Sequence, residues 1–156
     1  MKPHFIFTGL LTLLCLQLPA ALGAEQETRR NFDYHDDGYN QSAALKYEIF
    51  ENGEWRVFRS IEISRNRGSY GELNCALSYY GPLNESVKAL VMSPQGNSPL
   101  PLGYVPIGSP IPAKWQGMFS CPKAGPWNVA VAFFDPDGRW DSDSGRNFNL
   151  QFQAFL

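Results

Sequence analysis

The chain has 156 residues, with 13 Lys and Arg against 15 Asp and Glu and a formal net charge of −2. This length suits one domain with a sizeable core. The charge balance excludes a nucleic-acid partner, because the chain has no basic stripe that could replace the counterions of a phosphate backbone. Two short basic runs, residues 28–30 and 65–67, are expected to be solvated.

The N-terminus has the three parts of a secretory signal peptide. Lys2 precedes the apolar run FIFTGLLTLLCLQL, and Pro19 and the small residues AALGA follow it. The run is shorter than the ~20 residues of a membrane span, and no later segment supplies one. We therefore expect residues 1–23 to be removed and the protein to be secreted or periplasmic, with no membrane span. Residues 24–44 are predicted to be a polar lead-in, and residues 45–156 to be the folded domain.

Apolar and polar residues alternate with a period of two through most of this domain, which predicts strands. Six are expected, at residues 45–50, 54–63, 73–80, 87–93, 126–135 and 146–155. Asn52 and Gly53, between the first two, are typical of a tight hairpin turn. The proline-rich residues 94–112 predict an extended loop that can hold one short edge strand. No segment has a sustained helical period.

The cysteines agree with export. Once Cys15 leaves with the signal peptide, Cys75 and Cys121 remain as an even pair in an oxidising compartment, and we expect them to form one disulfide. A metal site would need more His and Cys ligands than the chain offers, and no cofactor is expected. Short antiparallel strands with one cross-link predict an all-β, immunoglobulin-like β-sandwich.

The last two predicted strands have clear faces. Their core faces should carry Trp127, Val129, Val131 and Phe133 in one strand, and Phe148, Leu150, Phe152 and Ala154 in the other. The opposite face of the final strand carries a row of amides, at positions 147, 149, 151 and 153. Trp140 lies in the connection between these strands, so neither core face fixes it. We expect it at the end of the sandwich, beside Asn147.

An aromatic ring next to short polar side chains can hold a sugar. The apolar C–H face of a pyranose packs on an indole, and its hydroxyls need groups that both donate and accept hydrogen bonds. The segment RWDSDSGRNF resembles the WDNNxGxNY signature of starch-binding carbohydrate-binding modules of families 21, 25 and 53. These modules are small β-sandwiches that bind α-1,4-glucans without hydrolysing them. Trp140, Asp141, Gly145 and Asn147 match the signature, and Phe148 stands where an aromatic is expected.

The resemblance implies particular residue roles. Sugar contacts fall on Trp140, Ser142 and Asn147, whereas Asp141 and Gly145 shape the turn: the aspartate bonds its own backbone and the glycine supplies a positive φ. Ser142 and Asp143 replace two asparagines of the signature, so a contact from Ser142 is expected to be indirect. A second aromatic normally completes the platform, and Trp55, Trp115, Tyr79 and Tyr80 are the candidates. Phe148 is expected to be structural.

Three other interpretations of this segment stay open. Trp140 could be a core plug, and Asp135, Asp137, Asp141 and Asp143 could form a calcium site, although their spacing does not fit an EF-hand. Asp141 and Asp143 could also face one way, as the carboxylates of inverting glycosidases do. Their solvated neighbourhood argues against raised pKa values, so we expect no enzyme. The predicted function is glycan binding, with a separate glycan-active enzyme as a possible partner. An immunoglobulin-like protein-interaction module is the alternative.

Overall fold

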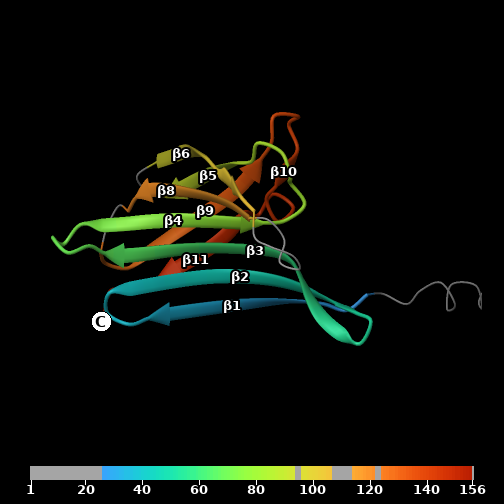
Figure 1. Ribbon diagram of the computed structural model, residues 1–156, viewed down its shortest axis with the longest axis horizontal. Coiled ribbons are helices and arrows are strands. Elements are labelled where there is room, and N and C mark those ends of the chain that lie inside the picture. The colour runs from blue at the N-terminus through green and yellow to red at the C-terminus, as the bar shows by residue number, and fades with distance from the viewer. Residues whose placement is uncertain (1–25, 94–95, 107–113, 122–123, 156) are drawn as a thin grey trace, which may run out of the picture.

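Two antiparallel sheets form the fold, which the computed structural model describes for residues 26–93, 96–106, 114–121 and 124–155 (Figure 1). The first sheet has the order β1 (Thr28–Asp36), β2 (Asn40–Glu51), β3 (Glu54–Arg67), β4 (Leu73–Tyr80), β8 (Lys114–Ser120) and β7 (Gly103–Val105). The second has the order β10 (Trp140–Asp141), β9 (Trp127–Phe134), β5 (Lys88–Ser93) and β6 (Gly96–Pro101), and β11 (Phe148–Phe152) also pairs with β9. The predicted signal peptide, residues 1–23, lies outside the described residues.

The inner faces of both sheets share one core, which confirms the predicted all-β, immunoglobulin-like sandwich. Strand β9 buries every second residue from Trp127 to Phe133, as predicted, and β11 buries Phe148, Leu150 and Phe152. Ala154 was predicted to join them but is exposed, because β11 ends at Phe152. Within the described part of the chain, no helix is long and apolar enough to cross a membrane.

The predicted boundary at residue 45 is wrong, because the sheet begins earlier. Strand β1 pairs with β2 along its whole length, from Thr28 opposite Ile49 to Asp36 opposite Gln41. Residues 24–44 are therefore not only a lead-in. The strand is polar because it lies at the edge of the sheet with most of its side chains exposed. Alternating burial, on which strand prediction depends, is therefore weak there.

The proline-rich segment and the residues after it hold more strands than predicted. Strands β6 and β7 both lie within residues 94–112, of which 94–95 and 107–112 are not described. Prolines are tolerated here because β6 and β7 are sheet edges. Strand β8 is not among the six expected strands, because Gly117 interrupts its pattern. A Cβ at Gly117 would lie 2.8 Å from Leu102 Cδ2 and 3.1 Å from Leu100 Cγ, so a larger residue here would force these leucine side chains to shift.

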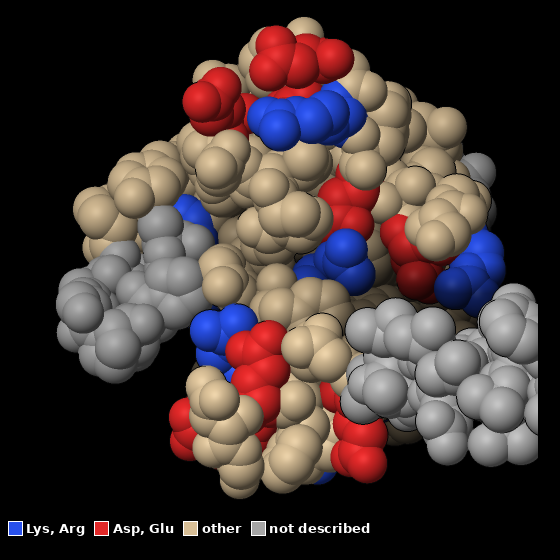
Figure 2. Space-filling view, turned by 90° about the vertical axis from the view of Figure 1, so that its right-hand side faces the viewer, with Lys and Arg blue, Asp and Glu red and all other residues tan. Residues whose placement is uncertain are grey.

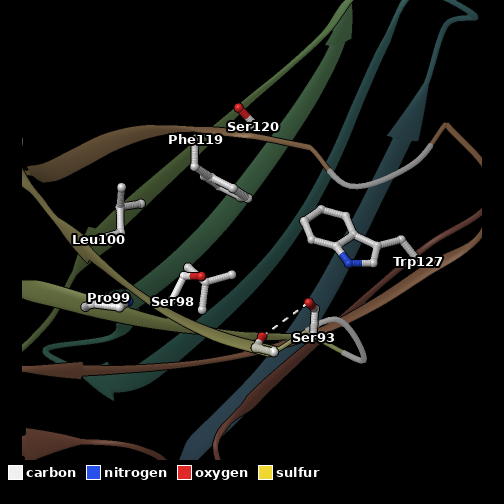
Figure 3. Close-up of a pocket in the computed structure, with 9 residues that line it drawn as sticks. Ser93, Ser98, Pro99, Leu100, Phe119, Ser120 and Trp127 are labelled. Carbon is white, nitrogen blue, oxygen red and sulfur yellow. Dashed lines mark hydrogen bonds between the residues drawn. The ribbon is translucent and has the colours of Figure 1, made fainter.

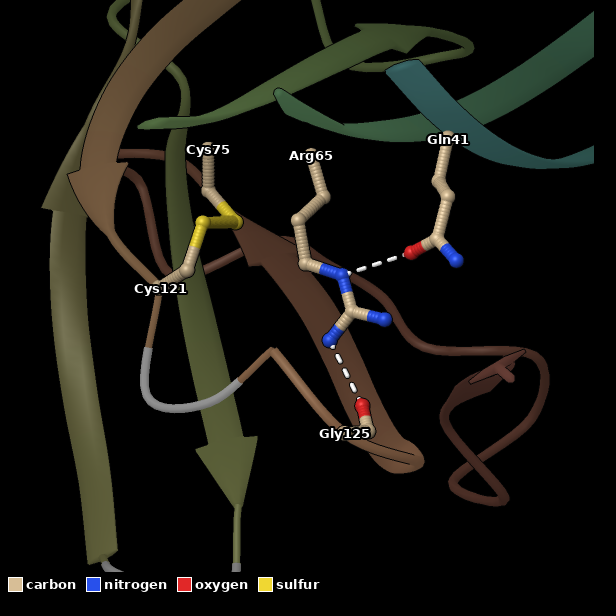
Figure 4. Close-up of a disulfide and its surroundings, with 5 residues drawn as sticks. All are labelled: Gln41, Arg65, Cys75, Cys121 and Gly125. Atoms are coloured by element: carbon tan, nitrogen blue, oxygen red, sulfur yellow. Dashed lines mark hydrogen bonds between the residues drawn. A yellow bond between two sulfur atoms is a disulfide. The ribbon is translucent and has the colours of Figure 1, made fainter. Parts of the chain in front are cut away.

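The predicted disulfide between Cys75 and Cys121 is present, with the two Cα atoms 5.4 Å apart (Figure 4). It joins β4 to the residue that follows β8, and these strands are neighbours in one sheet. The disulfide thus differs from the bridge between sheets in immunoglobulin domains. By the loop-entropy estimate, a link across this separation stabilises the fold by about 4 kcal/mol.

A buried arginine lies close to the disulfide in Figure 4. The expectation that residues 65–67 are solvated is wrong for Arg65, which is 0% exposed. Its guanidinium donates to Gln41 Oε1 at 2.7 Å and to the carbonyl oxygens of Gly125 and Gln153, both at 2.8 Å. Burial lowers the pKa of Arg65, but an arginine keeps its charge near neutral pH. Arg65 thereby ties β3 to β2, to the segment before β9 and to the end of the chain.

Candidate functional site

The connection between β9 and β10 is a tight turn organised by Asp135. Its carboxylate accepts hydrogen bonds from the backbone N–H groups of Asp137 at 3.0 Å and Arg139 at 2.9 Å. The guanidinium of Arg139 donates to the same carboxylate at 2.6 Å. Burial opposes the charged form, but the hydrogen bonds from Arg139 outweigh it and lower the pKa of Asp135. The turn therefore has a defined shape, and it ends at the residue before Trp140.

Trp140 is exposed but held in place. It is 55% exposed and lies opposite Phe134 in the pairing of β10 with β9. The two rings are stacked, with centroids 4.8 Å apart and planes 28° apart. The core-plug interpretation is wrong, because one face of the indole rests on Phe134 and more than half of the side chain is open to solvent. Trp140 stands at the end of the sandwich, as predicted.

The next residue, Asp141, has the opposite environment, with 4% exposure. Its Oδ2 accepts hydrogen bonds from Arg59 Nε at 2.9 Å and from the Tyr79 hydroxyl at 2.7 Å. The prediction that Asp141 bonds its own turn backbone is therefore wrong. Tyr79 stacks on Phe133, the cross-strand partner of Asp141, with ring centroids 4.0 Å apart. Asp141 thus anchors β10, a strand of the second sheet, to β3 and β4 of the first sheet and fixes the backbone that carries Trp140.

Residues 142–147 form a closed loop in which Ser142 and Asn147 meet. The backbone N–H of Asn147 donates to the Ser142 carbonyl at 2.7 Å, and the Gly145 N–H donates to Ser142 Oγ at 3.1 Å. Gly145 has φ of +85°, as predicted for a turn that favours glycine. The side-chain amide of Asn147 is half-buried and has no hydrogen-bond partner among the residues described. Phe148 follows in the core, packed against Tyr47.

The two tryptophans predicted as second aromatics lie in different surroundings. Trp55 is on the β2–β3 hairpin, where the Arg29 guanidinium lies over its ring at 4.1 Å and Phe50 packs beside it. Trp115 is half-buried on β8, edge-on to Tyr104 with ring centroids 5.4 Å apart. The Arg29 side chain thus occupies one face of Trp55, whereas Trp115 lines an open pocket.

This pocket has a volume of about 270 Å³ and an aromatic lining. Trp115, Tyr104 and Tyr80 contribute rings to it, and Asn84 contributes an amide. Tyr104 is 58% exposed. Tyr79 pairs with Trp115 across β4 and β8, and its hydroxyl donates to Asp141, the residue after Trp140. The pocket therefore lies at the same end of the sandwich as Trp140. Two aromatic surfaces therefore share one end of the molecule.

Charges on this end are mixed rather than of one sign. Figure 2 views the end that carries β10, and acidic and basic side chains lie next to one another across it. Several are paired, as in the ion pairs of Arg59 with Asp141, Arg139 with Asp135 and Arg146 with Asp143. Uncharged surface separates these groups (Figure 2). This end therefore suits a neutral, hydroxyl-rich ligand better than a polyanion.

The four aspartates proposed for calcium are engaged separately. Asp135 and Asp137 lie beside Arg139, Asp141 is paired with Arg59, and Asp143 is paired with Arg146. Across the described ranges, no three His, Cys, Asp or Glu side chains are grouped so that they could hold a metal ion. Asp141 and Asp143 also do not act as a pair, because Asp141 points into the sandwich and Asp143 bonds within its own loop.

Sequence reasoning missed Phe134, Arg59 and Tyr104. The position of Phe134 could have been predicted, because the DPDG turn between Phe134 and Trp140 favours a hairpin that places the two rings opposite each other. Arg59 and Tyr104 gave no such signal, since long-range pairing decides their positions. In comparisons with known proteins, no protein-family model, curated protein or solved structure matched this chain.

Proposed function

We propose that the protein binds glycan chains without hydrolysing them, and that the glycan is an α-glucan. One observation carries this proposal: Trp140 presents an exposed indole whose other face is fixed on Phe134. The α-glucan assignment rests on the resemblance of RWDSDSGRNF to the starch-binding signature. The signal-peptide prediction adds a secreted or periplasmic location, where polysaccharide is accessible.

The fixed indole is suited to stacking on a sugar ring. Apolar C–H groups of a pyranose would replace water on the open face of Trp140. Because Phe134 and the anchored β10 already hold the ring, little side-chain entropy would be lost on binding. Preorganisation of this kind favours affinity even where the contact area is small.

Polar groups on the loop after β10 and on β5 could contact the sugar hydroxyls. The unpaired amide of Asn147 can both donate and accept, and the Ser142 hydroxyl still has a proton to donate after accepting from Gly145. Lys88 is exposed and lies opposite Phe134 on β5, so it shares a face with the two stacked rings. It adds an ammonium donor that the starch-binding signature does not include.

The pocket around Trp115 supplies the second aromatic surface that the proposal needs. Tyr80, Tyr104 and Asn84 give it ring edges, hydroxyls and an amide. A glycan of several units could contact both this pocket and Trp140, because they lie at one end of the molecule. Binding without hydrolysis agrees with the buried, ion-paired state of Asp141, which leaves its carboxylate unable to reach a solvent-exposed bond.

A glycan panel tests the proposal directly. Purified mature protein should be titrated with amylose, cellulose and peptidoglycan fragments, with tryptophan fluorescence as the readout. We expect amylose to bind and to change the emission, because the exposed Trp140 would lose water contacts. If no glycan binds, the proposal is contradicted, and the protein-interaction module becomes the better interpretation.

The role of the Trp115 pocket has its own test. Trp115→Ala should weaken amylose binding by about tenfold, since removal of a stacked ring costs on the order of 1–2 kcal/mol. Binding of maltose should change less, because a ligand of two glucose units makes fewer contacts than amylose does. Equal effects on the two ligands would show that the two aromatic surfaces are not parts of one extended site.

A further inference from the structure

A second cavity opens at the opposite end of the sandwich. Strand β9 runs from Trp127 to Phe134, and its first residue lines this cavity, whereas its last residue supports Trp140. The cavity has a volume of about 270 Å³ and lies between β5 and β6 of one sheet and the end of β8 in the other (Figure 3). Its walls include Val91, Leu100 and Phe119.

The indole nitrogen of Trp127 is the notable group in this cavity. Trp127 is 5% exposed, and its Nε1 has no hydrogen-bond partner in the described structure. In Figure 3 this nitrogen faces the Ser93 side of the cavity. The ring cannot easily turn away, because it is stacked on Phe152 with centroids 5.4 Å apart. A buried donor without a partner is costly, so it favours an acceptor at this position.

The lining defines the chemistry of that acceptor. The cavity walls are mostly apolar, with hydroxyls at Ser93, Ser98 and Ser120, and none of the described residues that line it is charged. An ionised ligand would therefore lose hydration without gaining a counter-ion. An engineered apolar cavity of about 150 Å³ holds benzene, so a cavity of this size has room for one ring with a short substituent.

We propose that this cavity binds a small uncharged molecule with an aromatic or branched apolar body and one oxygen acceptor. The apolar body fills the space between Val91, Leu100 and Phe119. The oxygen accepts the hydrogen bond that Trp127 Nε1 offers. This site is independent of glycan binding, because it uses the other end of the sandwich and none of the same side chains.

Two matched probes test the proposal on the intact protein. Acetophenone carries a carbonyl oxygen, and α-methylstyrene has nearly the same planar shape with a CH₂ group in its place. We expect acetophenone to bind about 2- to 10-fold more tightly in ligand-detected NMR titrations, as one net hydrogen bond would produce. Absence of binding by both probes, or equal affinity for them, would overturn the proposal.

Two variants locate the binding. Trp127→Phe keeps a ring but removes the N–H, so it should abolish the preference for acetophenone. A preference that persists in this variant would show that Trp127 is not the donor. Ser98→Phe places a ring into the cavity from an exposed position on β6, so it should not disturb folding. It should weaken the binding of both probes at least tenfold. Unchanged binding in Ser98→Phe would place the probes elsewhere and contradict the assignment.

Discussion

Trp140 and Asp141 are neighbours in a two-residue strand, yet one is exposed and the other is buried. The alternation of a β-strand explains this, because successive side chains point to opposite faces. On the outer face Trp140 packs on Phe134, and on the inner face Asp141 lies beside Phe133 and Tyr79. Both positions match the starch-binding signature, but their environments differ in the structure. Asp141 anchors the strand, whereas the Trp140 ring is open to solvent.

The buried hydroxyl of Tyr79 should make the folded protein less stable as the pH rises into the alkaline range. Burial, and then the hydrogen bond to Asp141, raise the pKa of Tyr79 far above its usual value of about 10. The stabilisation is complete below pH ~10. Above that, the unfolded chain loses the proton and the folded protein keeps it, so the free energy of unfolding falls by about 1.4 kcal/mol per pH unit from this group.

Urea unfolding of the wild type and Tyr79→Phe between pH 8 and pH 11 measures this effect. At pH 8 the wild type should be more stable by about 1 kcal/mol, the net contribution of one hydrogen bond. The difference should shrink as the pH rises above about 10. Burial also raises the pKa of Tyr47, so only the difference between the two proteins reports on Tyr79. A difference that does not change with pH would contradict the raised pKa of the buried Tyr79 hydroxyl.

At the scale of elements, Arg65 connects segments that are far apart in the chain. Gln41 on β2 is a side-chain acceptor for its guanidinium, whereas Gln153 offers a backbone carbonyl. Gln41 is buried and also donates to Asp36 and to the Gln153 carbonyl. The edge hairpin of β1 and β2, the centre of the first sheet and the C-terminal segment are therefore joined by one polar cluster.

Gln41→Ala should destabilise the fold by about 1.5–3 kcal/mol, because it removes a buried hydrogen bond to a charged group. Gln153→Ala is the matched control: its side chain is exposed and its carbonyl oxygen is retained, so its effect should be below about 0.5 kcal/mol. Urea unfolding at neutral pH gives both values. Equal losses in the two variants would show that Arg65 does not depend on Gln41.

The elements that could be predicted from the sequence are those with one buried and one exposed face. Strands β4, β9 and β11 alternate cleanly, and their residues gave the correct core. Strands β1 and β8 could not be found in this way, because β1 has few buried residues and Gly117 breaks the pattern of β8. Pairing with neighbours distant in sequence, rather than local pattern, makes them strands.

The candidate site was predictable to a similar extent. Its end of the sandwich, the exposure of Trp140 and the positive φ of Gly145 followed from motif and turn chemistry. The partners of Asp141 did not, because Arg59 and Tyr79 are 82 and 62 residues away in the chain. An isolated motif contains no information on which strands will surround it, so the anchoring contacts needed the tertiary structure.

At the scale of the whole molecule, the sandwich has two different ends. One carries Trp140 and the aromatic pocket around Trp115, and the other carries the cavity beside Trp127. The core, the disulfide and Arg65 hold these ends in a fixed relation. We therefore expect ligands at the two ends to bind independently, without the closing of a lid or a change in the fold.

The amylose affinity of Trp140→Ala, measured beside that of Trp55→Ala, tests the central claim most directly. Trp140→Ala should weaken binding roughly tenfold or more, a loss of on the order of 1–3 kcal/mol, while costing only about 1 kcal/mol of folding stability for the lost ring pair with Phe134. Trp55→Ala should leave amylose affinity unchanged, because Trp55 is half-buried, with Arg29 over its ring and Phe50 packed beside it, whereas Trp140 is exposed. Unchanged affinity in Trp140→Ala, or an equal loss in both variants, would contradict the assignment of Trp140 as the sugar platform.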